Sequence, residues 1–243
     1  TTLRENGVAT NFVETWTGIT GQVQATGGAG NDTLDASALT TTRAMLDGGA
    51  GNNTLYGGGA SDTLIGGGNV GAKVNGPEGQ QGNNVVIGGA GADTIYGNAV
   101  NGAEGRGGNN ILLGGAGNDT IYGNWADGGN GGGRNIIVGG ADSDTLYDYK
   151  LADGAEGKGS ILIAGNTSLG ISDLKRVMDE WSSNHSYDTR VAKILSDAGG
   201  LNGDVHLQAD STVTSNFVAN HLWGTTQGTG LNWFLYRPGR DDV

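Results

Sequence analysis

Cysteine is absent from this chain of 243 residues, and proline occurs only twice. Without cysteine there is no disulfide framework and no redox argument about the compartment of the protein. No apolar run approaches the roughly 18 residues of a membrane-spanning helix, so we expect no membrane insertion. Positive charge is also scarce, because 13 basic residues stand against 25 acidic ones for a formal charge of -12. This balance argues against nucleic acid as a partner.

Catalytic signatures are missing as well. The three histidines, His185, His206 and His221, all lie in the C-terminal part of the chain, and none sits in a zinc-protease spacing. There is no G-x-S-x-G nucleophile elbow and no P-loop. We therefore expect that this chain is not an enzyme.

Glycine, by contrast, supplies 50 residues, which sit in short loops between apolar triplets. The clearest copy is Gly114–Tyr122, which reads GGAGNDTIY and fits the pattern G-G-x-G-x-D-x-U-x, where U is a large apolar residue. The pattern returns at Gly88–Tyr96 and Gly27–Asp35, with one change at Gly139–Tyr147, and more weakly at Gly57–Ile65. The repeated unit is therefore the organising feature of the sequence.

Each part of this unit has a physical role. The glycines let the backbone turn sharply with its carbonyl groups pointing inward, and the aspartate adds a carboxylate to that ring of oxygens. Oxygen-only ligands in a flexible loop suit Ca²⁺. The x-U-x triplet is a minimal strand with one side chain turned inward. Since a unit this short cannot bury its apolar residue alone, successive copies must stack.

In these units the chain closely resembles the RTX family, the haemolysin-type calcium-binding nonapeptide repeats. The resemblance implies an all-β fold, a parallel β-roll or β-solenoid with Ca²⁺ held between successive loops, in a protein that is secreted, extracellular or attached to the cell surface. A helix pair near the C-terminus is similar to the helical insertion of long secreted bacterial RTX-repeat proteins. We expect four segments: N-terminal capping strands at 1–26, the roll at 27–166, a two-helix insertion at 167–200, and a C-terminal β segment that closes the roll at 201–243.

The helix pair is predicted from apolar periodicity. Leu174, Val177, Met178 and Trp181 follow at helical spacing, with Ser172 as the expected N-cap. Ser186 is the expected N-cap of a second helix, and Gly199-Gly200 would end this helix. Its apolar side is formed by Tyr187, Val191, Ile194 and Leu195.

In the tail, the apolar residues of 205–207, 212–214, 220–223 and 227–235 return to a strand pattern, and Asn232 takes the aspartate position of a degenerate repeat. Trp16 is expected to cap the other end.

Alternate loops of a roll fall on opposite edges, and the two edges of this chain differ. One edge carries Asp62, Asp93, Asp119 and Asp144, and the other carries Asn53, Asn84, Asn110 and Asn135, each set at spacings of 31, 26 and 25 residues. We expect Ca²⁺ in the three gaps of the aspartate edge. Stacked asparagines can instead form a ladder of hydrogen bonds without a metal.

The expected calcium-binding set joins the four edge aspartates with loop glycines and two further acids. Asp32, beside Asn53, is expected to hold one weaker ion, whereas Asp142 is either a supplementary ligand or a turn residue. The loop glycines in this set are Gly57, Gly59, Gly88, Gly89, Gly91, Gly114, Gly115, Gly117, Gly139 and Gly140.

Insertions on the asparagine edge distinguish this chain from the simplest roll. They span Gly66–Asn83, Gly97–Asn109, Gly123–Arg134 and Asp148–Gly159. Three of them carry a glutamate, namely Glu78, Glu104 and Glu156. These acids either line a solvated loop edge or form a second cation row or a ridge that binds a partner, and the sequence leaves both interpretations open.

One of the two predicted sheets is apolar on both faces. Its strands are Val85–Ile87, Ile111–Leu113, Ile136–Val138 and Ile161–Ile163. Outward aliphatic rows of this size need cover, which the long loops, the C-terminal segment or another copy of the chain could supply.

The first hypothesis for function is a secreted, calcium-folded structural roll that self-associates into a filament, coat or matrix, or adheres to another extracellular or surface protein. The alternative is a C-terminal calcium-dependent folding and secretion module of a larger enzyme or adhesin. The chain starts at Thr1 and has no signal-peptide pattern, which suits a processed product or a part of a longer protein. A glycan-active enzyme would need a cleft lined by carboxylates.

The calcium assignment leads to a first prediction. Replacing both Asp93 and Asp119 by alanine removes a carboxylate from every gap of the aspartate edge, so we expect ordered β structure to be lost at low millimolar calcium. Circular dichroism measures this loss, and an unchanged spectrum in the double variant would contradict the assignment.

Overall fold

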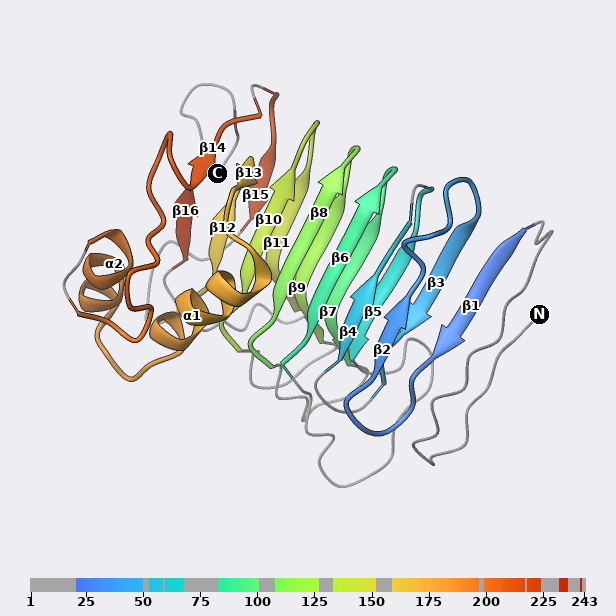
Figure 1. Ribbon diagram of the computed structural model, residues 1–243, viewed down its shortest axis with the longest axis horizontal. Helices are drawn as coiled ribbons and strands as arrows, with labels where there is room; N and C mark the ends of the chain where they lie inside the picture. The colour runs from blue at the N-terminus through green and yellow to red at the C-terminus, as the bar shows by residue number, and fades with distance from the viewer. Residues whose placement is uncertain are drawn as a thin grey trace.

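The computed structural model describes residues 21–49, 53–58, 60–67, 83–100, 108–126, 133–151, 159–196, 199–216, 218–223, 232–235 and 241. Its strands alternate between two parallel sheets, so the chain winds in coils that stack from the N-terminal to the C-terminal end (Figure 1). The predicted parallel β-roll, with two helices near the C-terminus, is confirmed. None of the helices in the described part of the chain is long and apolar enough to cross a membrane.

Each sheet contains seven strands. The first holds, in spatial order, β1 (Gln22–Thr26), β3 (Arg43–Asp47), β5 (Thr63–Gly67), β7 (Thr94–Val100), β9 (Thr120–Ala126), β11 (Thr145–Leu151) and β15 (His221–Trp223). The second holds β2 (Thr33–Asp35), β4 (Thr54–Tyr56), β6 (Val85–Ala90), β8 (Ile111–Ala116), β10 (Ile136–Gly140), β12 (Ile161–Ile163) and β16 (Trp233–Leu235).

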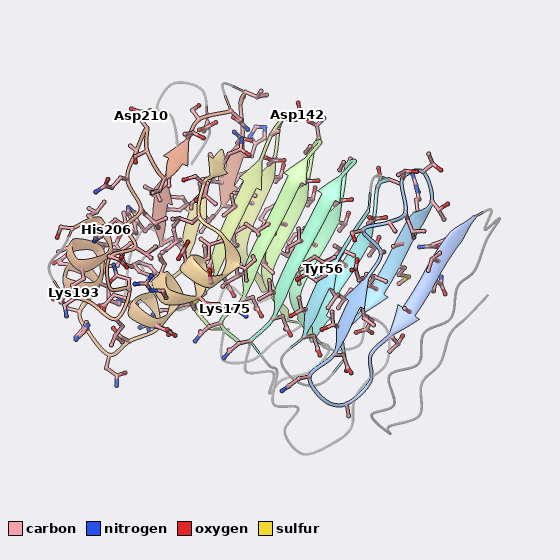
Figure 2. The ribbon with its side chains drawn as sticks, in the orientation of Figure 1. Tyr56, Asp142, Lys175, Lys193, His206 and Asp210 are labelled. Atoms are coloured by element: carbon pink, nitrogen blue, oxygen red, sulfur yellow. The ribbon has the colours of Figure 1, made fainter. Side chains whose placement is uncertain are left out.

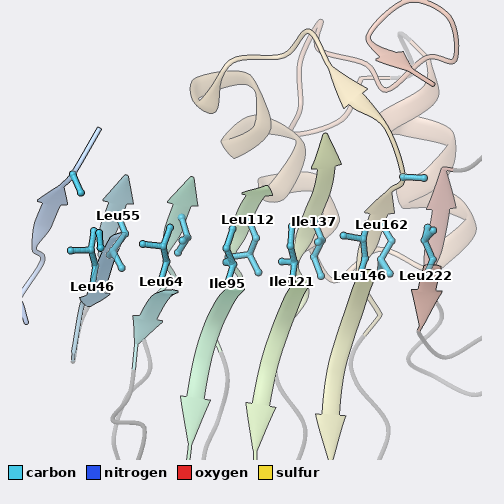
Figure 3. Packing of buried hydrophobic residues seen from close by; sticks show 14 residues of the cluster. Leu46, Leu55, Leu64, Ile95, Leu112, Ile121, Ile137, Leu146, Leu162 and Leu222 are labelled. Atoms are coloured by element: carbon cyan, nitrogen blue, oxygen red, sulfur yellow. The ribbon is translucent and has the colours of Figure 1, made fainter. Parts of the chain in front are cut away.

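The core between the sheets comes from the middle residue of each short repeat. In β7, Ile95 is fully buried while Thr94 and Tyr96 on either side are half-buried. The same position in every coil supplies one aliphatic side chain, and these side chains form a continuous row along the roll (Figure 3). The labelled members include Leu46, Leu55, Leu64, Ile95, Leu112, Ile121, Ile137, Leu146, Leu162 and Leu222.

Several strands are longer than the predicted triplets. β7 and β9 run for seven residues each, into stretches that we assigned to inserted loops. The extension has a simple cause, because Ala99 pairs with Trp125 and Val100 with Ala126 in the next coil. Residues that follow the repeat therefore stack in register too, and their backbone groups continue the hydrogen-bonded ladder.

Stacking also orders the aromatic side chains on the outer face of the first sheet. The ring centroids of Tyr96 and Tyr122 lie 5.0 Å apart, and those of Tyr122 and Tyr147 lie 4.8 Å apart, with the rings nearly parallel. Trp223 continues the row at 6.3 Å from Tyr147. Such pairs add stability beyond the area they bury, so this row reinforces the coil register.

The two predicted helices form, with one difference at a cap. α1 spans Ile171–Trp181, and its N-cap is Gly170, which makes no side-chain capping hydrogen bond, so the assignment of Ser172 as N-cap was wrong. α2 spans Tyr187–Leu195, and the Ser186 side chain accepts a hydrogen bond from the backbone N–H of Thr189, as predicted.

The C-terminal region covers the doubly apolar sheet. Outward residues of β6, β8, β10 and β12 pack against the apolar face of α1 and against the chain that follows α2. In Figure 1, α1 lies across the front of this sheet. The buried members from the covering region are Leu174, Val177, Met178, Trp181, Ile194, Val205, Leu207 and Val213. Of the expected lining residues of α2, Leu195 is instead exposed.

Hydrogen bonds fasten this cover to the roll. Trp181 is fully buried, and its indole N–H donates to the Gly159 carbonyl at 3.1 Å. Arg134, just before β10, donates to the carbonyls of Ser182 and Ser183 at the end of α1. Arg190 of α2 places its guanidinium 4.6 Å from the Trp181 ring centroid. The cover is thus held by polar contacts as well as by apolar packing.

The tail closes the roll through both sheets. β15 pairs with β11, and β16 pairs with β12, so each sheet gains its last strand from the predicted C-terminal β segment. A short antiparallel pair joins β13 (Asn166–Thr167) to β14 (Val213–Thr214). The predicted strand at 205–207 was wrong, since those residues form an irregular segment that packs under the helices.

Some predictions fall on residues outside the described part of the chain. These are the strands and the Trp16 cap expected within 1–20, the acids Glu78, Glu104 and Glu156, and Gly59. They stay predictions.

The helical cover yields a test of its contribution. Trp181→Ala empties a fully buried site and removes the bond to Gly159, so we expect the free energy of unfolding to fall by about 3–5 kcal/mol. Trp223→Ala is the matched control, because Trp223 is 58% exposed, and should lower it by about 1 kcal/mol. Urea denaturation at saturating calcium measures both values, and equal effects would contradict the packing described here.

Candidate metal-binding edge

The glycine-rich loops lie along one edge of the roll, where each strand of the second sheet passes into the next strand of the first (upper edge in Figure 1). In the loop between β8 and β9, Gly115 and Gly117 have φ of 117° and 114°, which side chains rarely allow. A Cβ added at either would collide with a carbonyl oxygen of the preceding coil, Gly89 O or Gly91 O. The loops therefore stack closely, with carbonyl groups facing the neighbouring loop.

One oxygen of each loop aspartate ties adjacent coils together. The backbone N–H of Asp62 donates to Asp93 Oδ1 at 2.7 Å, and the N–H of Asp93 donates to Asp119 Oδ1 at 2.8 Å. The N–H of Asp119 donates to Asp144 Oδ1 at 3.0 Å. The four aspartates that the spacing predicted are therefore brought together as successive rungs of one ladder, and each is buried.

The asparagine edge has the same ladder. The N–H of Asn53 donates to Asn84 Oδ1 and that of Asn84 to Asn110 Oδ1, both at 2.9 Å, and Asn110 continues to Asn135 at 3.0 Å. The hydrogen-bonded ladder of asparagines expected from the spacing is therefore present. The two edges therefore share one backbone arrangement, and they differ in the second polar atom of each side chain.

That second atom is satisfied at three positions of the asparagine edge, whereas the Nδ2 group of Asn135 donates no hydrogen bond to any described residue. The Nδ2 groups of Asn53 and Asn84 each donate to a glycine carbonyl of the next coil, Gly66 O and Gly97 O, at 3.0 Å. Asn110 repeats the contact with Gly123 O at 3.3 Å. Each of these three amides thus supplies a proton donor to a carbonyl oxygen of the next coil.

On the aspartate edge an acceptor takes the place of the donor. Oδ2 of Asp93, Asp119 and Asp144 is buried and accepts no hydrogen bond from any residue that the structure describes. A Cβ added at Gly88 would collide with both Asp93 Oδ2 and Gly114 O, so these two oxygens flank the same point. Two facing oxygen acceptors need a proton or a cation between them.

Burial changes the acidity of these carboxyl groups. It is the main cause that raises the pKa of Asp93 to about 8, and the neighbouring aspartates raise it further. Burial likewise raises the pKa of Asp119 and of Asp144 to about 7, with added repulsion from the Asp142 carboxylate. Without a cation, these sites hold protons at a pH where an ordinary aspartate is ionised.

The outer loops vary on this arrangement. Asp62 Oδ2 accepts a hydrogen bond from the backbone N–H of Gly58 at 2.6 Å, so this carboxylate is partly satisfied within its own loop. Asp32 lies on the asparagine edge, yet its buried Oδ2 also accepts no hydrogen bond from the described residues. A Cβ added at Gly27 would collide with Asp32 Oδ2 and with Gly48 O, which repeats the pairing of oxygens at Gly88.

Asp142 acts as a turn residue in this structure. It takes the place of a loop glycine with φ of 72°, and its carboxylate accepts a hydrogen bond from the Gly117 backbone N–H at 3.1 Å. Figure 2 shows it at the tip of the loop edge. Its side chain therefore lies across the coil boundary, next to the ladder instead of within it.

Three polar residues of the ladders were missed, namely Asn220, Asp241 and Asp148. Asp144 donates its N–H to Asn220 Oδ1, and Asn220 donates to Asp241 Oδ1, so the tail adds two rungs. On the other edge, Asp148 replaces a glycine and is fully buried; the Ser160 hydroxyl donates to it, and burial raises its pKa to about 6. Aligning coils would have revealed Asp148 opposite Gly123, whereas no pattern marks Asp241.

The donor set suits calcium better than a softer metal. Among the described residues no three His, Cys, Asp or Glu side chains converge on one point, so a bound ion would rest largely on main-chain carbonyl oxygens. The buried, unpartnered aspartate oxygens and the closely stacked glycine turns supply such a set. Ca²⁺ accepts carboxylate and carbonyl oxygens in flexible geometry, so these residues fit it.

Comparison with protein families agrees with this chemistry. The model of the RTX calcium-binding nonapeptide repeat (4 copies) matches residues 21–38, 45–69, 78–102, 104–127 and 129–149. These segments of the chain are RTX calcium-binding repeats. Repeats of the family bind Ca²⁺, and proteins that carry them are typically secreted and generally structural or calcium-binding in role. Searches of curated proteins and of solved structures find no match to the chain.

The raised pKa values predict how the ion-free RTX roll responds to pH. The folded-state pKa values of Asp93, Asp119 and Asp144 exceed the ordinary value of 3.8, so their protons stabilise the fold below about pH 4. This contribution is lost as the pH rises through 7 and 8. In chelator, we expect Tm to fall between pH 5 and pH 8.

Calcium should reverse this trend because the ion competes with protons for the same oxygens. We therefore expect added calcium to raise Tm more at pH 8 than at pH 5. Thermal melts followed by circular dichroism give all four values. A Tm in chelator that climbs from pH 5 to pH 8 would contradict the assigned shifts.

Proposed function

We propose that this chain is a calcium-dependent folding module of a secreted protein, in which Ca²⁺ holds successive loops of the aspartate edge together. The proposed gaps lie between Asp62 and Asp93, between Asp93 and Asp119, and between Asp119 and Asp144, with Asp32 as the residue of a weaker site. The observation that carries the proposal is the row of buried aspartate oxygens without hydrogen-bond donors. When bound, the ion supplies the positive charge that these oxygens lack.

The magnitude of this effect is comparable with the stability of a domain. At millimolar calcium and a dissociation constant of about 10⁻⁴ M, each ion stabilises the folded state by about 1.4 kcal/mol. Three gaps together contribute about 4 kcal/mol, against a typical total of about 5–15 kcal/mol. The same module would be much less stable at the low calcium level of a cytosol, which suits folding after export.

Self-association was first argued from the doubly apolar sheet, and the cover of that sheet weakens the argument. Val85, Ile111 and Ile136 are buried under the C-terminal region of the same chain. Their row therefore supplies no reason to expect a second copy. Of the two hypotheses drawn from the sequence, the calcium-folded module is better supported than the filament or coat subunit.

Charged groups of the helical region form structural ion pairs, which fits a non-catalytic role. His185 pairs with the buried Glu180 at 2.7 Å, and Arg176 pairs with Asp204 at the end of the helical region. These contacts hold the cover in place. We propose that any activity of a larger parent protein resides outside this chain.

Sedimentation velocity tests the proposed function. In millimolar calcium we expect a compact monomer, and in excess chelator at neutral pH we expect the same monomer with a lower sedimentation coefficient, because the roll expands. Large particles that form only with calcium would support the filament or coat instead. An identical, compact species in both buffers would contradict calcium-dependent folding.

A further inference from the structure

We propose that side-chain amides replace calcium wherever the ion row stops, so that asparagine at positions 93 and 119 gives a roll that folds without calcium. The proposal rests on the calcium-dependent folding described above. It states that one side-chain atom per coil determines whether the coil boundary binds calcium. A repeat that binds an ion then has a carboxylate oxygen at this position, and a repeat that needs no ion has an NH₂ group.

The asparagine edge is the first observation. There, each Oδ1 accepts the backbone N–H of the preceding coil, and three of the Nδ2 groups, those of Asn53, Asn84 and Asn110, donate to a glycine carbonyl of the following coil. On the aspartate edge the Oδ1 contact is the same, and Asp93 Oδ2 stands beside Gly114 O. An amide at this position would keep the first contact and turn the second into a hydrogen bond.

The C-terminal end of the aspartate edge is an independent second observation. The Nδ2 group of Asn216 donates to Gly140 O at 3.0 Å and to Asp142 O at 2.6 Å, two carbonyls of the last glycine-rich loop. It also lies 3.5 Å from Ala164 O. A donor group therefore sits among the loop oxygens at the point where no further aspartate loop follows.

The same amide is fixed by its own partners. Asn216 Oδ1 accepts hydrogen bonds from Val218 N and from the Asn220 side chain, both at 3.2 Å, and Asn220 in turn supplies the next rung after Asp144. The tail thus places two asparagine amides after Asp144, before the last rung at Asp241. Both places where the aspartate row gives way, the opposite edge and the C-terminal end, use amide donors.

The experiment compares three forms of the full chain: wild type, Asp93→Asn/Asp119→Asn and the control Asp93→Ala/Asp119→Ala. The two variants remove the same carboxylates, which border all three gaps, and differ only in the amide. Far-ultraviolet circular dichroism and Tm are measured at neutral pH in millimolar calcium and in excess chelator. Equilibrium dialysis with calcium counts the ions bound to each form.

We expect the asparagine variant to show the folded spectrum in chelator, with no shift of Tm on adding calcium and a loss of bound ions relative to wild type. The alanine variant should lack the folded spectrum in both buffers. An asparagine variant that is as unfolded as the alanine variant in chelator, beside a wild type that responds to calcium, would overturn this inference and leave the proposed function standing. A wild type equally folded in both buffers, with no bound calcium, would contradict both.

Discussion

The structure depends on what stands between two oxygen atoms at each coil boundary. Parallel coils of three to seven residues per strand leave one polar side chain at each turn, and that side chain must satisfy the backbone of two neighbours. Asparagine does so alone, because it carries both an acceptor and a donor. Aspartate supplies two acceptors, and Oδ2 of Asp93, Asp119 and Asp144 accepts no hydrogen bond from the described residues. Burial makes this conflict costly, since water cannot reach the group.

The other features of the fold hold the coils in place, so that the aspartate edge determines how the roll responds to calcium. A core to which each sheet contributes one row of side chains, seen in Figure 3, keeps the coils in register with little apolar area per coil. The aromatic row on one sheet and the asparagine ladder hold the coils together without a metal. The helical cover shields the second sheet and places the polar side chains of Lys193 and His206 at the C-terminal end of the roll (Figure 2). Calcium then acts at the aspartate edge, while the other contacts between coils form without it.

Much of this could be predicted because stacking repeats one short pattern. The spacing of Asp62, Asp93 and Asp119 placed these residues on one edge, and the apolar triplets placed the core. The predictions failed where backbone pairing or the tail decides the outcome. The extension of β7 past Tyr96 follows from pairing between coils. The position of the α1 N-cap at Gly170 follows from how α1 meets the sheet. Asp241 becomes a rung only because the tail folds back.

The central claim is that calcium occupies the gaps between the aspartates of the aspartate edge and does not bind along the asparagine ladder. A crystal structure at millimolar calcium, with ions located by their anomalous scattering, tests it most directly. The account predicts ions in the gaps joining Asp62, Asp93, Asp119 and Asp144, and none along Asn84, Asn110 and Asn135. Ions along the asparagines, or aspartate gaps that remain empty, would contradict it.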